Sequence, residues 1–237
     1  MDGDEDPLDE QDLAWDEEGH STRAFEAWTM SRDDILIFFD LTHGWSTVEY
    51  KRLRRAAEVS AAETYGDVPA EFDRLAKGLW PTTYEEILCA SGYVMLVAYF
   101  EVYLEDALQE VGEQLGFRME PDGRKDGPDF SSLAKVFRRI GLEVETTEVK
   151  RIRELRHWVA HRRASIETAG TPGEVDLEKW RDRRDRRVSI DQVRADAGVL
   201  HDVIRAVDPT MWRARWLGEP SENLRAIVDA LHEQDAR

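Results

Sequence analysis

The stretch YVMLVAYFEVYLEDAL, residues 93–108, decides the fold. Read as a helix, it is apolar around much of its circumference, which is typical of a helix buried on several sides. The capping box Thr82-x-x-Glu85 opens this helix and Gly116 ends it, so we expect it to run to about Leu115. A helix of this kind lies at the centre of a bundle, and the sequence therefore predicts an all-α, up-and-down helical bundle.

Capping and stop signals predict shorter helices on both sides of this one. The expected ranges are 31–41 with a stop near Gly44, 47–65, 69–79, 129–140, 146–164, 191–207 and a last helix from 221. We expect Asp129 to cap the fourth of these, Thr146 or Thr147 the fifth and Asp191 the sixth. The predicted division is an acidic tail (1–22), an N-terminal helical extension (23–80), the bundle (81–210) and a C-terminal helical tail (211–237).

The composition indicates a soluble globular protein, with 41% hydrophobic and 35% charged residues in 237. The single cysteine, Cys89, lies in an apolar run, which predicts a buried thiol and excludes a disulfide framework or a cysteine-rich zinc site. No lysine or arginine precedes Arg23, unlike a signal peptide. The longest apolar run, 87–100, is shorter than a bilayer span. We therefore expect a cytoplasmic protein with no membrane partner.

The charge is distributed unevenly along the chain. The net charge of -18 argues against nucleic-acid binding. However, residues 1–20 contribute ten carboxylates, whereas residues 150–187 hold twelve basic and seven acidic side chains. The acidic tail is expected either to aid solubility or to lie in a basic groove and restrain it.

The basic segment contains the stretch RIRELRHWVAHRR, residues 151–163. Arg156 occupies the helical position between Ile152 and Val159 where another aliphatic side chain is expected, so it needs a polar partner. Glu101, set among apolar residues of the long helix, is the candidate partner, because a carboxylate there is costly unless it is paired. The alternative is that Glu101 reaches solvent at the edge of the bundle.

Two histidines, His157 and His161, are four residues apart and so share one helix face. A zinc protease helix needs glutamate directly after the first histidine, where Trp158 stands, and no cysteine or further histidine follows nearby. We therefore expect no metal site. The sequence also has no glycine-rich phosphate loop and no dinucleotide-binding motif, so no cofactor is expected.

The string from Arg156 to His161 resembles the R-x4-6-H signature of the HEPN superfamily, in which a polar residue often follows the arginine. The long helix with its embedded carboxylate and the shorter helix 129–140 are similar in order to the helical core of that family. The resemblance covers residues 82 to about 207.

The resemblance implies a metal-independent endoribonuclease in which His161 moves protons and Arg156 stabilises the phosphate charge. His157 would orient the phosphate or the motif; the alternative is an ordinary surface histidine. It also implies a homodimer that joins two motifs in one cleft, with Trp158 at the interface. A further implication is a toxin or antiviral role, restrained by an antitoxin or another regulatory protein.

RNA is the expected partner of the basic segment. The side chains expected to contact RNA are Arg153, Arg162, Arg163, Arg183 and Arg184, with Trp180 for base stacking. For residues 178–187 the alternative is an ordinary solvated charged face. Two other hypotheses remain for the whole chain. One is a catalytically silent HEPN-like module that binds RNA, nucleotide or a protein partner; the other is a plain helical bundle in which Arg156 and His161 have no function.

Overall fold

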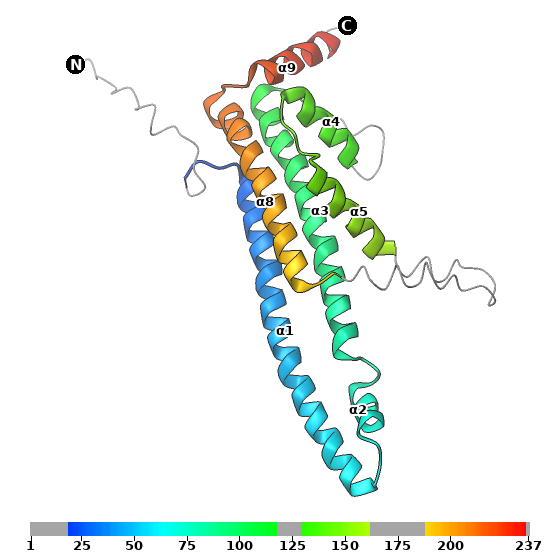
Figure 1. Ribbon diagram of the computed structural model, residues 1–237. Helices are drawn as coiled ribbons and strands as arrows, with labels where there is room; N and C mark the ends of the chain where they lie inside the picture. Colours follow the sequence, from blue (N-terminus) through cyan, green and yellow to red (C-terminus); the bar gives the residue numbers. More distant parts are fainter. Residues whose placement is uncertain (1–18, 118–128, 162–187, 236–237) are drawn as a thin grey trace, which may run out of the picture. The chain divides into compact units, whose positions relative to one another are not determined.

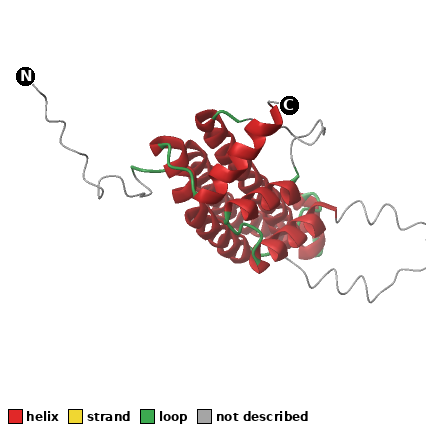
Figure 2. Cartoon of the chain, turned by 90° about the horizontal axis from the view of Figure 1, so that it is seen from above, coloured by secondary structure: helices red, strands yellow, loops and turns green. Residues whose placement is uncertain are grey.

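The computed structural model describes residues 19–117, 129–161 and 188–235. All secondary structure in these ranges is helical, and Figure 2 shows helices and loops without a strand in the described part of the chain. The prediction of an all-α protein is thus confirmed for these residues. The match of the bundle to a HEPN core stays a prediction.

Figure 1 shows the helices in the order of the sequence. They are α1 (Arg23–Thr64), α2 (Val68–Ala76), α3 (Pro81–Leu115), α4 (Phe130–Ile140), α5 (Thr147–His161), α8 (Ile190–Trp212), a π-helix η2 (Arg213–Leu217) and α9 (Glu222–Asp235). The chain forms two compact units. The first unit comprises residues 1–30, 98–150 and 199–237, and the second comprises 31–97 and 151–198. The domain division expected from the sequence stays a prediction.

Several helix ends agree with the sequence because local side chains set them. Asp129 caps α4 by accepting a hydrogen bond from the backbone N–H of Ser132, and Gly141 ends the helix with a φ of 93°. Thr146 caps α5, since its hydroxyl oxygen accepts from the Val149 N–H at 3.2 Å. The stop predicted after Leu115 is also confirmed, with Gly116 at a φ of 74°.

The predicted break near Gly44 is wrong, because α1 continues through it from Arg23 to Thr64. The hydroxyls of Ser46 and Thr47 donate to the carbonyl of His43 inside the helix and cap nothing. A glycine in a helix interior costs only about 1 kcal/mol relative to alanine, which tertiary packing easily outweighs. The helix start expected at residue 31 also lies within this helix.

The limits expected for α8 are wrong as well. The side chain of Ser189, and not Asp191, accepts from the N–H of Gln192 at the start of the helix. At the other end α8 continues through Pro209 to Trp212. Proline removes one hydrogen bond from a helix, and the burial of Met211 and Trp212 beyond it favours continuation.

The core of the first unit is aromatic. Phe100 lies 6.3 Å from Trp28 and 6.2 Å from Phe130, measured between ring centroids. The Trp28 indole N–H donates to His201 at 3.2 Å, which satisfies its polar atom in this core. Asn223 of α9 donates to the carbonyl of Ile140 at the end of α4.

In the second unit α1 packs closely against α3. A Cβ added at Gly92 would lie 1.9 Å from the ring of Phe39, so only glycine permits this approach. Phe39, Cys89 and Tyr93 are each fully buried here, which confirms the prediction of a buried thiol.

The stretch Val68–Leu115 contains an 18-residue window with a mean hydropathy of 1.7, half of which is buried inside the protein. By length and composition this window could cross a membrane. The apolar run 87–100, judged by its length alone, did not indicate this. The core helix of a soluble bundle has the same composition. The cytoplasmic location therefore stays a prediction.

Candidate functional site

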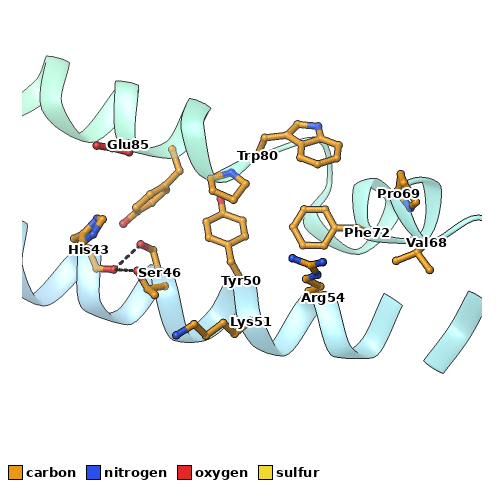
Figure 3. A pocket seen from close by; sticks show the side chains of 13 residues that line it. His43, Ser46, Tyr50, Lys51, Arg54, Val68, Pro69, Phe72, Trp80 and Glu85 are labelled. Atoms are coloured by element: carbon orange, nitrogen blue, oxygen red, sulfur yellow. Dashed lines mark hydrogen bonds between the residues drawn. The ribbon is translucent and has the colours of Figure 1, made fainter. Parts of the chain in front are cut away.

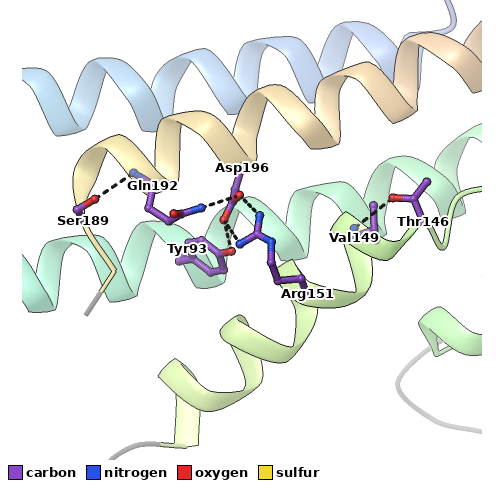
Figure 4. Close-up of polar contacts among 7 residues, drawn as sticks. All are labelled: Tyr93, Thr146, Val149, Arg151, Ser189, Gln192 and Asp196. Carbon is purple, nitrogen blue, oxygen red and sulfur yellow. Dashed lines mark hydrogen bonds and ion pairs between the residues drawn. The ribbon is translucent and has the colours of Figure 1, made fainter. Parts of the chain in front are cut away.

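The helix that carries the motif, α5, is anchored in the second unit through Arg151. This arginine forms an ion pair with Asp196 of α8, whose side chain is 1% exposed. The Tyr93 hydroxyl of α3 donates to the same carboxylate at 2.5 Å, and the Gln192 amide donates at 2.9 Å. Figure 4 shows these side chains converging on Asp196 from three helices. A buried carboxylate with several donors is stable and fixes the helices that supply them.

Burial raises the pKa of the Tyr93 phenol well above its usual range, and the hydrogen bond to Asp196 and the charge of that carboxylate raise it further. The phenol therefore keeps its proton at neutral pH and acts as a donor. Arg151 consequently has a structural role in this arrangement, and the sequence reasoning did not assign it one.

Arg156 lies five residues further along α5, and its side chain is half-buried. Its Nε atom is buried and has no hydrogen-bond partner among the residues that the structure describes. A guanidinium N–H that is removed from water without an acceptor is costly, so an anion that supplied an acceptor would bind favourably. This is the strongest sign of a ligand position on the motif helix.

The other motif residues differ in environment. His157 is exposed, whereas Arg153 and Trp158 are half-buried, and all three have polar or ring contacts. His161 is the last residue of α5, and its side chain lies outside the described residues. The remaining predicted RNA contacts, Arg162, Arg163, Trp180, Arg183 and Arg184, also lie outside them.

Glu101 is half-buried on the part of α3 that belongs to the first unit, and its side chain is not without a partner. Arg156 belongs to the second unit. Their ion pair stays a prediction.

The second unit also contains a cavity of about 590 Å³ that the sequence analysis missed. Figure 3 shows that its aromatic side chains come from α1, α2, the turn after α2 and the start of α3. The Phe72 ring lies 5.1 Å from that of Trp80 and 6.2 Å from that of Tyr50, measured between centroids. The Tyr50 hydroxyl donates to the Leu79 carbonyl at 2.9 Å, which holds the turn against α1.

Charged side chains, including Lys51, Arg54 and Glu85, also line this cavity. Aromatic walls with cations beside them suit a flat molecule that carries negative charge. The sequence signal for this cavity is the set of aromatic residues between positions 50 and 84. An interpretation from helix periodicity alone assigns such residues to ordinary core packing.

Among the described residues, no group of three or more histidine, cysteine, aspartate or glutamate side chains could hold a metal ion. Comparison of the chain with family models, with curated proteins and with solved structures finds no match. The functional assignment therefore depends on the chemistry of the site itself.

Proposed function

We propose that the protein is a metal-independent endoribonuclease of HEPN type that cleaves RNA by attack of a 2'-hydroxyl on the neighbouring phosphorus. The observation that carries the proposal is the buried Nε of Arg156, which has no hydrogen-bond partner among the described residues. A phosphate oxygen is an acceptor of the right charge for this N–H. Glu101, if it pairs with Arg156, would fix the direction of the guanidinium.

The reaction needs stabilisation of negative charge on the phosphate oxygens. Arg156 remains protonated at any physiological pH and offers a planar set of donors. Partial burial strengthens its interaction with that charge, because less water screens it. The Arg151–Asp196 pair holds the same helix, so the donor is already positioned when RNA binds.

The reaction also needs a base to remove the 2'-hydroxyl proton and an acid to protonate the leaving 5'-oxygen. His161 suits either role because its ordinary pKa lies near neutrality. Each chain supplies one such motif, so we propose a homodimer in which two copies complete the acid and base pair. His157, which is exposed on α5, would orient the phosphate. A toxin or antiviral role, with an antitoxin or other regulatory protein as partner, belongs to the same proposal.

Incubation of the purified protein with total RNA in EDTA tests the proposal. We expect cleavage to continue without metal and to leave 2',3'-cyclic phosphate or 3'-phosphate ends. Arg156→Ala and His161→Ala should each lower the rate by roughly 100-fold or more. Arg74→Ala, at an exposed ion pair on α2, is the matched control and should cleave like the wild type. Equal rates in all four proteins would overturn the proposal.

The aromatic cavity supports a second candidate function, a silent module that binds a nucleotide. Its rings could stack on a base while Lys51 and Arg54 meet the phosphates. Calorimetry with ADP is the direct test. Micromolar binding that Phe72→Ala abolishes, together with no RNA cleavage, would favour this function over the first.

A further inference from the structure

Helix α1 exposes a row of large apolar side chains within the second unit. These residues are between 56% and 69% exposed and are Ile37, Phe38, Leu41, Trp45 and Val48, here called the α1 face. Their spacing places them on one side of the helix. Scattered apolar residues are normal on a protein surface, but a contiguous row that includes tryptophan is typical of an interaction site.

The opposite side of α1 contacts other parts of the second unit. Phe39 is buried against Gly92 of α3, and Ser46 is buried as well. Tyr50 and Arg54, also on that side, line the aromatic cavity. The α1 face is therefore additional to the surface that α1 needs for its own fold.

Gly44 lies in the middle of the α1 face, between Leu41 and Val48. A Cβ at this position would meet nothing within 4 Å in the single chain, so the internal packing does not require glycine here. Glycine is unfavourable in a helix interior unless something gains from the missing side chain. Close approach of a second backbone is such a gain.

The two ends of the same side of α1 carry opposite charge. Asp34 lies before the apolar row, whereas Arg55 and Arg52, which is paired with Glu49 at 2.6 Å, lie after it, and Asp34, Arg52 and Arg55 are exposed. A second copy in antiparallel orientation would set Asp34 of each chain near Arg52 and Arg55 of the other. A parallel orientation would place like charges together, which costs free energy.

We propose that the α1 face is the interface of a homodimer in which the α1 helices of two copies pack antiparallel and cross at Gly44. The face is self-complementary about this residue in shape and in charge, as a two-fold interface requires. The proposal does not rest on the ribonuclease assignment. It also differs from the interface expected at Trp158, a side chain that is half-buried in the single chain.

Analytical ultracentrifugation at low salt tests whether the dimer forms through this face. We expect a wild-type dimer at micromolar concentration. Trp45→Ala should weaken it by ~30-fold or more, as truncation of an interface tryptophan does. Leu41→Asp should remove the association through the α1 face, leaving only the separate contact proposed for the motif helix, and should unfold like the wild type, because the position is exposed. Met95→Asp, at an exposed apolar residue of α3, is the control and should remain dimeric. A monomeric wild type, or an association state that Leu41→Asp leaves unchanged, overturns the proposal.

Disulfide trapping tests the orientation. Gly44→Cys should form a cross-link between the copies on mild oxidation, because the residue lies on the two-fold axis. Val59→Cys, exposed and 15 residues along the helix, should not, because an antiparallel crossing separates the two copies of this residue by ~45 Å. The native Cys89 is buried, and burial raises its pKa to about 11, so it does not compete. Efficient cross-linking through residue 59 would overturn the antiparallel arrangement. Neither assay involves RNA, so a failure here is distinct from a failure of the ribonuclease proposal.

Discussion

Helix α8 carries two buried aspartates, one in each unit, and they differ in the burial of their partners. In the first unit Asp208 accepts from the backbone N–H and the hydroxyl of Thr22 and from the Tyr103 hydroxyl. Thr22 and Tyr103 are almost completely buried. In the second unit Asp196 binds Tyr93, which is buried, but also Arg151, whose side chain is 48% exposed.

This difference indicates different roles for the two carboxylates. Thr22 also accepts from the Phe25 N–H, so Asp208 fixes the residue that caps the start of α1. Its cluster is closed to water and serves stability. The Asp196 cluster holds the motif helix α5 through a side chain that reaches solvent. It therefore positions a helix on which Arg156 has a buried Nε without a partner in the described part of the chain.

Asp208→Ala should have the largest effect on stability. Removing this acceptor leaves the buried donors of Thr22 and Tyr103 unsatisfied, and we expect a loss of about 3 to 5 kcal/mol in the free energy of unfolding. Urea denaturation measures it. Asp202→Ala, at an exposed position of the same helix, is the control and should change little. A loss no larger than that of the control would remove the distinction between the two clusters.

Asp196→Ala should cost less, about 2 to 3 kcal/mol, because Arg151 can turn toward water when its partner is lost. Salt should reduce this cost, since the exposed part of the ion pair is screened. The same variant should also slow RNA cleavage, because α5 loses its anchor. Urea denaturation at two salt concentrations and a cleavage assay measure these effects. A cost above that of Asp208→Ala would contradict the comparison.

Asp106 extends the comparison to a carboxyl group whose pKa is raised by burial, with no compensating charge among the residues that the structure describes. Because the pKa of Asp106 is higher in the folded protein, folding favours the neutral carboxyl. The stability that this carboxyl contributes is complete below about pH 3.8, its ordinary pKa, and is lost as the pH rises through its pKa in the folded protein. Asp106→Asn should therefore unfold at slightly higher urea concentration at pH 7 and lose this advantage at pH 3. An advantage of equal size at both pH values would show that burial of the charge is not its cause.

Sequence reasoning succeeded where adjacent residues decide the outcome. Asp129 and Gly141 define α4 by backbone contacts within one turn, so no distant information was needed. It failed at Gly44 and Pro209, because packing of residues far apart in the sequence outweighs the local cost of a helix breaker. Helix-breaking residues report a local preference only.

The candidate site was predicted in part. Arg156 stood out because it interrupts an apolar row, and its partly buried position agrees with that interpretation. The role of Arg151 was missed because its partner is 45 residues away. A signal was present, since Asp196 lies among Val193, Ala197 and Leu200 at helical spacing, the same anomaly that identified Glu101. The cavity could not be predicted, because its rings come from three helices and a turn.

We propose that two arginines of α5 have different roles: Arg151 anchors the helix through Asp196, and Arg156 stabilises the phosphate during cleavage. The most direct test measures the rate of RNA cleavage in EDTA and the free energy of unfolding for Arg156→Gln and Arg151→Gln side by side. We expect Arg156→Gln to lose roughly 100-fold or more in rate with a stability within about 0.5 kcal/mol of the wild type. We expect Arg151→Gln to lose stability and to retain more of the rate. Full activity in Arg156→Gln would contradict the claim.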